Sequence, residues 1–239
     1  MIKIPRFTIC PLLIAGLLGL TLAGCGQEPE QTQKPIVKTT YGYISGTTEE
    51  GVFSFKGIPY AKAERFMPPQ APDTWEGVHD HSKFGPIAMQ VNSWSPESAM
   101  DEQKLFTVNV WTQGLNDGKK RPVMFWLHGG GFAVGASDDP ITDGKMLAQK
   151  GDIVLVSVNH RLNILGFLDL SAFGDKYARS ANVGMLDVVA ALEWVNKNIQ
   201  NFGGDPANVT IFGESGGGGK VGTLMSMPAA KGLFHKAII

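Results

Sequence analysis

The stretch that decides the fold of this chain is Asn208-Val-Thr-Ile-Phe-Gly-Glu-Ser-Gly-Gly217. Its first half is β-rich, and the glycines on both sides of Ser215 predict a strand that turns sharply into a helix with the serine at the apex. The apex residue must take a strained backbone conformation, and neighbouring glycines leave room for it because they lack a Cβ. Such a turn would expose the serine oxygen and place the Gly216 N–H at a helix N-terminus, where it stabilises negative charge. The stretch therefore predicts a nucleophilic serine with an anion-binding donor beside it.

A second glycine-rich stretch follows another strand. Residues 122–127 form an apolar run of strand length, which ends in His128-Gly-Gly-Gly-Phe132. Three successive glycines leave backbone N–H groups free to point into a cavity, which larger side chains would obstruct. Beside a serine turn, such a loop supplies further donors to a developing oxyanion. The alternative is a plain flexible turn after a core strand.

The order of the apolar runs predicts the architecture. Strands are expected near 41–55, 106–111, 122–127, 153–158 and 208–212, and helices near 143–149, 184–199 and from 215 onward, with a loop-rich segment over 57–101. The helix at 184–199 has apolar residues at helical spacing: Met185, Val188, Val189, Leu192, Val195 and Ile199. Alternating strands and helices predict an α/β fold, a mostly parallel sheet with helices on both faces.

From about Tyr41 to its end, the chain resembles the type-B carboxylesterase and cholinesterase family of α/β-hydrolases. The matching stretches, in the family's order, are Phe55–Ala61, Leu105–Trp111, His128–Phe132, Val158–Leu162, Leu165–Phe167, Asn182–Asp187, Ala191–Val195, Asn201–Pro206, Val209–Gly217 and Leu233–Ile238. Together they are far more specific than either glycine-rich stretch alone.

The resemblance implies an α/β-hydrolase fold that cleaves small-molecule carboxylic esters through an acyl-serine intermediate, without a cofactor or a metal. It assigns Ser215 as the nucleophile and the backbone N–H groups of Gly130, Gly131 and Gly216 as the oxyanion hole. The family usually has alanine where Gly216 stands and tyrosine where His160 stands, and neither departure removes a catalytic atom. Two alternatives are a non-catalytic cholinesterase-like binding module, which typically lacks the serine, and a hormone-sensitive-lipase-like esterase.

A general base for Ser215 is harder to find. In this fold an acid and then a histidine follow the serine, but only His235 follows it, and no Asp or Glu lies between Ser215 and the C-terminus. The helix after the serine should carry His235 to the opposite end of the sheet, roughly 17–20 Å away. His128 and His160 follow strand ends near the serine, and the resemblance assigns them to the glycine loop and the pocket wall. Glu214 is expected to point away from Ser215 into a buried hydrogen bond.

Family members are more than twice as long as this chain, and Ile239 falls where an apolar strand begins. We therefore interpret residues 41–239 as the N-terminal portion of the domain, with the acid and the histidine supplied by the absent half. We expect the chain to be inactive alone.

Other side chains have weaker assignments. Trp94 and Phe132 are candidates for lining the acyl or alcohol pocket, and packed loop aromatics are an equal alternative. His79 and His81 fall in an early loop and are expected to be solvated. Asp205 is expected to serve the turn before the strand that leads to the serine.

The N-terminus resembles a bacterial lipoprotein signal. Two basic residues precede an apolar stretch over 9–23, which is shorter than the ~20 residues of a membrane-spanning helix. The stretch ends in Leu-Ala-Gly-Cys25, so the resemblance implies cleavage of residues 1–24 and lipidation of Cys25. An ordinary secretory peptide is the alternative. Residues 25–40 are mostly polar, with prolines, and predict a flexible tether, so we expect a lipid-anchored protein of the bacterial cell envelope.

Composition sets the remaining bounds. The formal net charge is −1, from 21 basic and 22 acidic residues, so nothing argues for a nucleic-acid partner. The two cysteines, Cys10 and Cys25, lie within the signal and at its end, so the mature domain is expected to have no disulfide.

Overall fold

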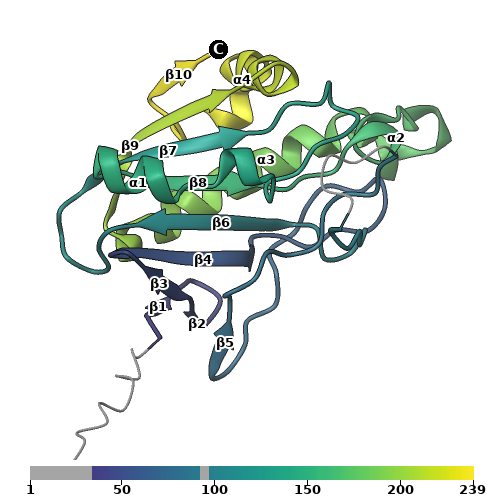
Figure 1. The fold of residues 1–239 in the computed structure, drawn as a ribbon. Coiled ribbons are helices and arrows are strands. Elements are labelled where there is room, and N and C mark those ends of the chain that lie inside the picture. Colours follow the sequence, from purple (N-terminus) through teal and green to yellow (C-terminus); the bar gives the residue numbers. More distant parts are fainter. Residues whose placement is uncertain (1–33, 92–96) are drawn as a thin grey trace, which may run out of the picture. The chain divides into compact units, whose positions relative to one another are not determined.

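The computed structural model describes residues 34–91 and 97–239, which belong to one compact unit (Figure 1). Its strands are β1 (Ile36–Lys38), β2 (Tyr43–Ser45), β3 (Thr47–Glu49), β4 (Val52–Pro59), β5 (Val78–Asp80), β6 (Thr107–Thr112), β7 (Arg121–Leu127), β8 (Val154–Val158), β9 (Gly204–Gly213) and β10 (Lys236–Ile238). Its α-helices are α1 (Lys145–Gly151), α2 (Asn163–Phe167), α3 (Val183–Asn198) and α4 (Gly216–Ser226). Short 3-10 helices are η1 (Pro140–Thr142), η2 (Ser171–Phe173), η3 (Asp175–Tyr177), η4 (Ser180–Asn182), η5 (Ile199–Phe202) and η6 (Pro228–Ala230).

Seven strands form the main sheet in the order β10-β9-β7-β8-β6-β4-β3. The first four strands in this order are mutually parallel, whereas β6, β4 and β3 join through antiparallel pairings. The predicted α/β fold is confirmed, with a mixed sheet whose parallel part begins at β8. Because β7, β8 and β9 are parallel, their carboxyl ends meet at one edge of the sheet, and that edge carries the His128 loop, the His160 segment and Ser215.

The main sheet is covered on both faces. In Figure 1, α1 lies in front of the strands and α3 passes behind them. Along β7, Val123, Phe125 and Leu127 are buried in the main core, and Met124 and Trp126 face the α1 side and are half-buried. The six apolar residues that predicted the helix at 184–199 are all buried, so this prediction is confirmed. The hydrophobic period of α3 therefore reflects its packing against the sheet.

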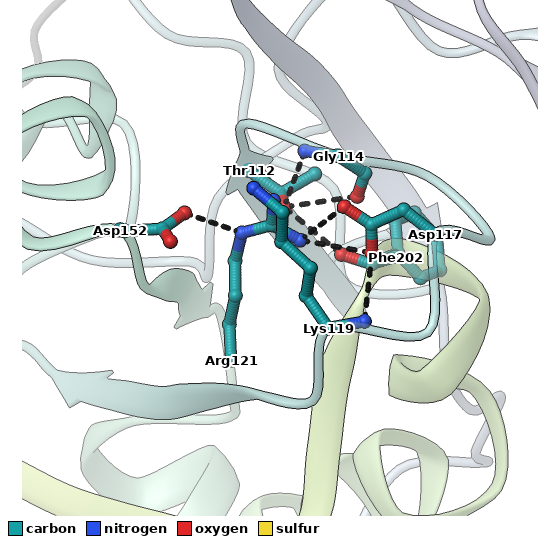
Figure 2. Close-up of polar contacts among 7 residues, drawn as sticks. All are labelled: Thr112, Gly114, Asp117, Lys119, Arg121, Asp152 and Phe202. Atoms are coloured by element: carbon teal, nitrogen blue, oxygen red, sulfur yellow. Dashed lines mark hydrogen bonds and ion pairs between the residues drawn. The ribbon is translucent and has the colours of Figure 1, made fainter.

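The end of the sheet opposite Ser215 is closed by polar contacts around Arg121 (Figure 2). The buried Arg121 guanidinium donates to Asp152 Oδ1 at 2.6 Å and contacts Asp117 Oδ2 at 2.8 Å. Beside it, the Thr112 hydroxyl donates to the Phe202 carbonyl at 2.9 Å. Gly203 has φ +74°, and a Cβ there would come within 2.6 Å of the Arg121 side chain. The first glycine of the Gly-Gly-Asp-Pro stretch is therefore required by close packing at this end.

The structure differs from the sequence predictions at several places. Within the tether predicted over 25–40, residues 36–38 form β1 with Val37 buried, so ordered structure begins before Tyr41. The segment predicted as loop over 57–101 contains β5, on which His79 stacks against Trp75 at 5.2 Å between ring centroids. His81 is half-buried, and burial lowers its pKa, so the expectation that it is solvated is wrong.

Four predictions lie outside the described residues: the signal over 1–24, the lipidated Cys25, the first part of the tether and the pocket residue Trp94. Within residues 34–91 and 97–239, no helix has both the length and the apolar character needed to cross a bilayer.

Candidate active site

Ser215 stands at the apex of the predicted turn, between β9 and α4. Its backbone has φ 54° and ψ −118°, a left-handed conformation that residues other than glycine rarely adopt. The residue is exposed. Gly213 and Gly217, two residues to either side of Ser215, pack closely on each other, because a Cβ at Gly213 would lie 2.5 Å from the Gly217 backbone. The strand, strained serine and helix start confirm the local geometry that the sequence predicted.

The triple-glycine loop bends sharply after β7. Gly130, Gly131 and Phe132 all have positive φ, of 89°, 59° and 64°. The Gly130 carbonyl accepts hydrogen bonds from the N–H groups of Ala133 and Val134, at 3.0 and 3.1 Å. Within the part of the chain that the structure describes, the N–H groups of Gly130, Gly131 and Gly216 donate to no backbone acceptor. They are therefore free to bind an oxyanion.

The glycine loop and the serine turn lie against each other. A Cβ built on Gly216 would come within 2.5 Å of the Gly131 nitrogen, and a Cβ on Gly129 would lie 3.7 Å from the Ser215 Cβ. The predicted donors Gly131 and Gly216 and the candidate nucleophile Ser215 thus lie in one small region. The close approach also explains why Gly216 stands here: a side chain at this position would push the loop away.

Two buried histidines pack behind the loop. The rings of His128 and His160 stack with centroids 5.0 Å apart and planes 10° from parallel. Each Nδ1 lies 2.9 Å from a neighbouring carbonyl oxygen, and each Nε2 is buried without a partner among the described residues. Burial, followed by the nearby Lys220 charge, lowers the pKa of His128 to about 3 and that of His160 well below its ordinary value. Burial of both rings favours a structural role behind the glycine loop over the role of a base.

Residues 33–239 match the carboxylesterase family. The chain belongs to this family. The para-nitrobenzyl esterase of Bacillus subtilis (strain 168) is 47% identical over 213 residues, which cover 85% of this chain and 43% of that protein.

Two solved structures of esterases are similar. A carboxylesterase from Geobacillus stearothermophilus has a TM-score of 0.80 and 50% identity, over 84% of this chain and 42% of that chain. An esterase from Clostridium hathewayi has a TM-score of 0.81 and 47% identity, over 86% of this chain and 43% of that chain. The chain therefore spans less than half the length of these relatives.

The remaining candidates for the base and the acid are His235 and Glu214. His235 lies just before β10, where its N–H donates to the Val209 carbonyl at 2.8 Å. Because Ile238 pairs with Phe212, His235 is level with the middle of β9 and far from Ser215, as predicted. The prediction for Glu214 is wrong: it is exposed, and its carboxylate lies against Gly129 at the wall of a pocket of about 480 Å³. Its place directly before the apex turns it outward, away from the core.

Asp205 serves the turn as predicted, since its carboxylate accepts the Ala207 N–H at 2.9 Å. Phe132 packs edge-to-face on Phe167 at 5.3 Å, and its carbonyl accepts the Asn163 N–H at 2.7 Å. The loop that carries the candidate oxyanion donors is therefore anchored at its far end on α2.

Lys220 was missed by the sequence reasoning. It lies on α4, is fully buried, and its Nζ donates to the His128 carbonyl at 2.8 Å. One signal was available: Lys220 stands four residues before Leu224 and next to Val221, both buried, so helical spacing places it on the inward face.

Proposed function

We propose that this chain carries the nucleophile and the oxyanion hole of a serine carboxylesterase that acts on small-molecule esters. The observation that carries the proposal is the exposed, strained Ser215 against a loop of free glycine amides. The name para-nitrobenzyl esterase, borne by a relative 47% identical to this chain, agrees with an ester substrate.

In the proposed reaction, Ser215 Oγ attacks the ester carbonyl while a general base takes its proton, and the tetrahedral intermediate collapses to the acyl-serine as that base returns the proton to the leaving alcohol. The N–H groups of Gly130, Gly131 and Gly216 donate to the oxyanion of the intermediate. Loss of one such donor raises the barrier by about 2.7–4 kcal/mol, so a three-donor site supplies much of the catalysis. Water then hydrolyses the acyl-serine and restores the hydroxyl.

The base that activates Ser215 is a separate part of the proposal. Among the described residues, the Nε2 atoms of His128 and His160 are buried, and His235 lies beside Val209, level with the middle of β9. We propose that the base and its orienting carboxylate lie in the part of the domain that the relatives contain and this sequence does not span. An intact Ser215 argues against the alternative of a non-catalytic binding module, and the family match supports type B over a hormone-sensitive-lipase-like esterase.

The test uses p-nitrophenyl acetate hydrolysis by the purified 239-residue chain and by a longer protein that continues its reading frame. We expect Ser215-dependent turnover only in the longer protein, with Ser215→Ala reducing it to the background rate. Equal turnover by the longer protein and its Ser215→Ala variant would reject the nucleophile. Turnover by the short chain that vanishes in Ser215→Ala would instead place the base within these residues.

We also propose that the protein is exported and anchored through acyl chains on Cys25. The support is the sequence alone: basic residues, an apolar stretch and then Leu-Ala-Gly-Cys25. Each buried acyl CH₂ contributes roughly 0.8 kcal/mol, and more than one chain gives stable anchoring. A labelled fatty acid should be incorporated into the wild type and not into Cys25→Ser. A secreted, unlabelled wild type would show an ordinary secretory peptide instead.

A further inference from the structure

Lys220 differs from the other fully buried cations of the described chain. Arg121 is paired with Asp117 and Asp152, and Arg161 is paired with Asp187. None of the ion pairs among the described residues includes Lys220. Burying an ammonium group without a counter-charge is unfavourable, so its position calls for a compensating role.

The surroundings of Lys220 are the glycine loop. Its Nζ donates to the His128 carbonyl at 2.8 Å and lies 5.3 Å from the centre of the Phe132 ring. These two residues are the first and the last of the loop that contains the candidate oxyanion donors. Lys220 therefore contacts both ends of the loop from one point on α4.

The same face of α4 touches the loop at two more positions. Gly216 lies against the Gly131 nitrogen, and a Cβ on Gly219 would come within 3.2 Å of the Phe132 ring. Small residues at 216 and 219 let the loop approach the helix closely, and among the described residues Lys220 supplies the only hydrogen bond between α4 and this loop. The helix that begins at Ser215 thus has a surface fitted to the loop that faces the serine.

We propose that Lys220 is a positioning residue: its side-chain nitrogen ties the His128 carbonyl to the helix that follows Ser215 and so keeps the glycine amides in register with the nucleophile. The restraint on the loop follows from the contacts alone. Its catalytic consequence rests on the proposed esterase function.

The restraint is expected to depend on pH. Burial lowers the pKa of Lys220 to about 7. The titratable groups that face it are His128, on the loop after β7, and His160, on the segment after β8, and both stay neutral because their own pKa values are low. A pKa lowered by burial means that the closed loop favours the neutral amine and that protonation favours an open loop with a hydrated ammonium group, so the restraint should strengthen as the pH rises through 7.

Amide hydrogen exchange tests the restraint without any need for activity. The reporters are the N–H groups of Ala133 and Val134, which bond to the Gly130 carbonyl inside the loop. At pH 8.5 we expect these amides to exchange about 10- to 100-fold faster in Lys220→Met than in the wild type, after correction for intrinsic rates. At pH 6 the ratio should fall toward one. The control is Lys231→Met, which changes an exposed lysine downstream of the same helix and should match the wild type at both pH values.

The wild type alone provides a second measurement that does not depend on how the variant folds. Protection factors of the Ala133 and Val134 amides should increase between pH 6 and pH 8.5, as the neutral amine becomes the dominant form of Lys220. Equal loop exchange in folded wild type and Lys220→Met at pH 8.5 would overturn the proposal. So would a loss of protection that is the same at both pH values, because a packing role alone does not titrate near pH 7.

In a Ser215-dependent form of the enzyme, Lys220→Met should lower kcat at pH 8.5 with little change in KM. An absence of hydrolysis in the wild type would count against the esterase function, and the exchange experiment would still decide the role of Lys220.

Discussion

Ser215→Gly is expected to make the protein more stable. Ser215 has φ 54° and ψ −118°, and a backbone held in such a sparsely populated region stores about 1–3 kcal/mol. Glycine adopts this conformation without strain, but its greater freedom in the unfolded chain offsets about 0.4–1 kcal/mol of the gain. Because Ser215 is exposed, removing its side chain loses little burial. The net expectation is a gain of about 0.5–2 kcal/mol in the free energy of unfolding.

Urea unfolding at pH 7, followed by circular dichroism, measures this difference. The matched control is Ser215→Ala, which removes the hydroxyl and keeps the Cβ that causes the strain, so it should stay within about 0.5 kcal/mol of the wild type. The expected order of stability is therefore Gly above Ala and Ala equal to wild type. A Gly variant that is less stable than the Ala variant would refute the reasoning, because it would show that no strain is stored at the apex.

Three further substitutions test other contacts by denaturant unfolding. Lys220→Met should be more stable than the wild type at pH 6 by up to about 5 kcal/mol, because burial lowers the pKa of Lys220 from 10.5 to about 7. Between pH 7 and 10 the unfolded chain keeps a proton on Lys220 that the folded chain has lost, so wild-type stability should rise by about 1.4 kcal/mol per pH unit. The stability advantage of Lys220→Met should shrink by the same amount, and a difference that stays constant with pH would contradict this. Gly216→Ala should destabilise the folded protein by about 1–3 kcal/mol because the new Cβ meets Gly131, and a gain of up to about 1 kcal/mol in helix propensity partly offsets this cost. A net stabilisation would show that the loop moves aside at no cost. Asp187→Asn should destabilise by about 3–5 kcal/mol because it leaves the buried Arg161 without its counter-charge, whereas exposed Asp169→Asn should have little effect.

The parts of the structure that the sequence predicted are those with a local cause. The glycines around Ser215 predicted the strained apex because that backbone conformation depends on neighbouring residues lacking a Cβ. The apolar spacing over 184–199 predicted α3 because its period matches the helical repeat. The short β1 was not predicted, because three residues have no recognisable period and pair only with β2.

By itself, the amino-acid sequence determined the order of the main strands and helices, the identity of the nucleophile candidate and the membership of the carboxylesterase family. It did not determine what lies behind the glycine loop. Only the tertiary structure placed Lys220 against the carbonyl of His128, 92 positions away, and stacked His128 on His160. Likewise, it showed that Glu214 faces outward and that Gly216 is small because Gly131 approaches it. The reason is that local conformation follows from neighbouring residues, whereas burial, pKa and contact between distant segments depend on how the sheet brings the ends of its strands together.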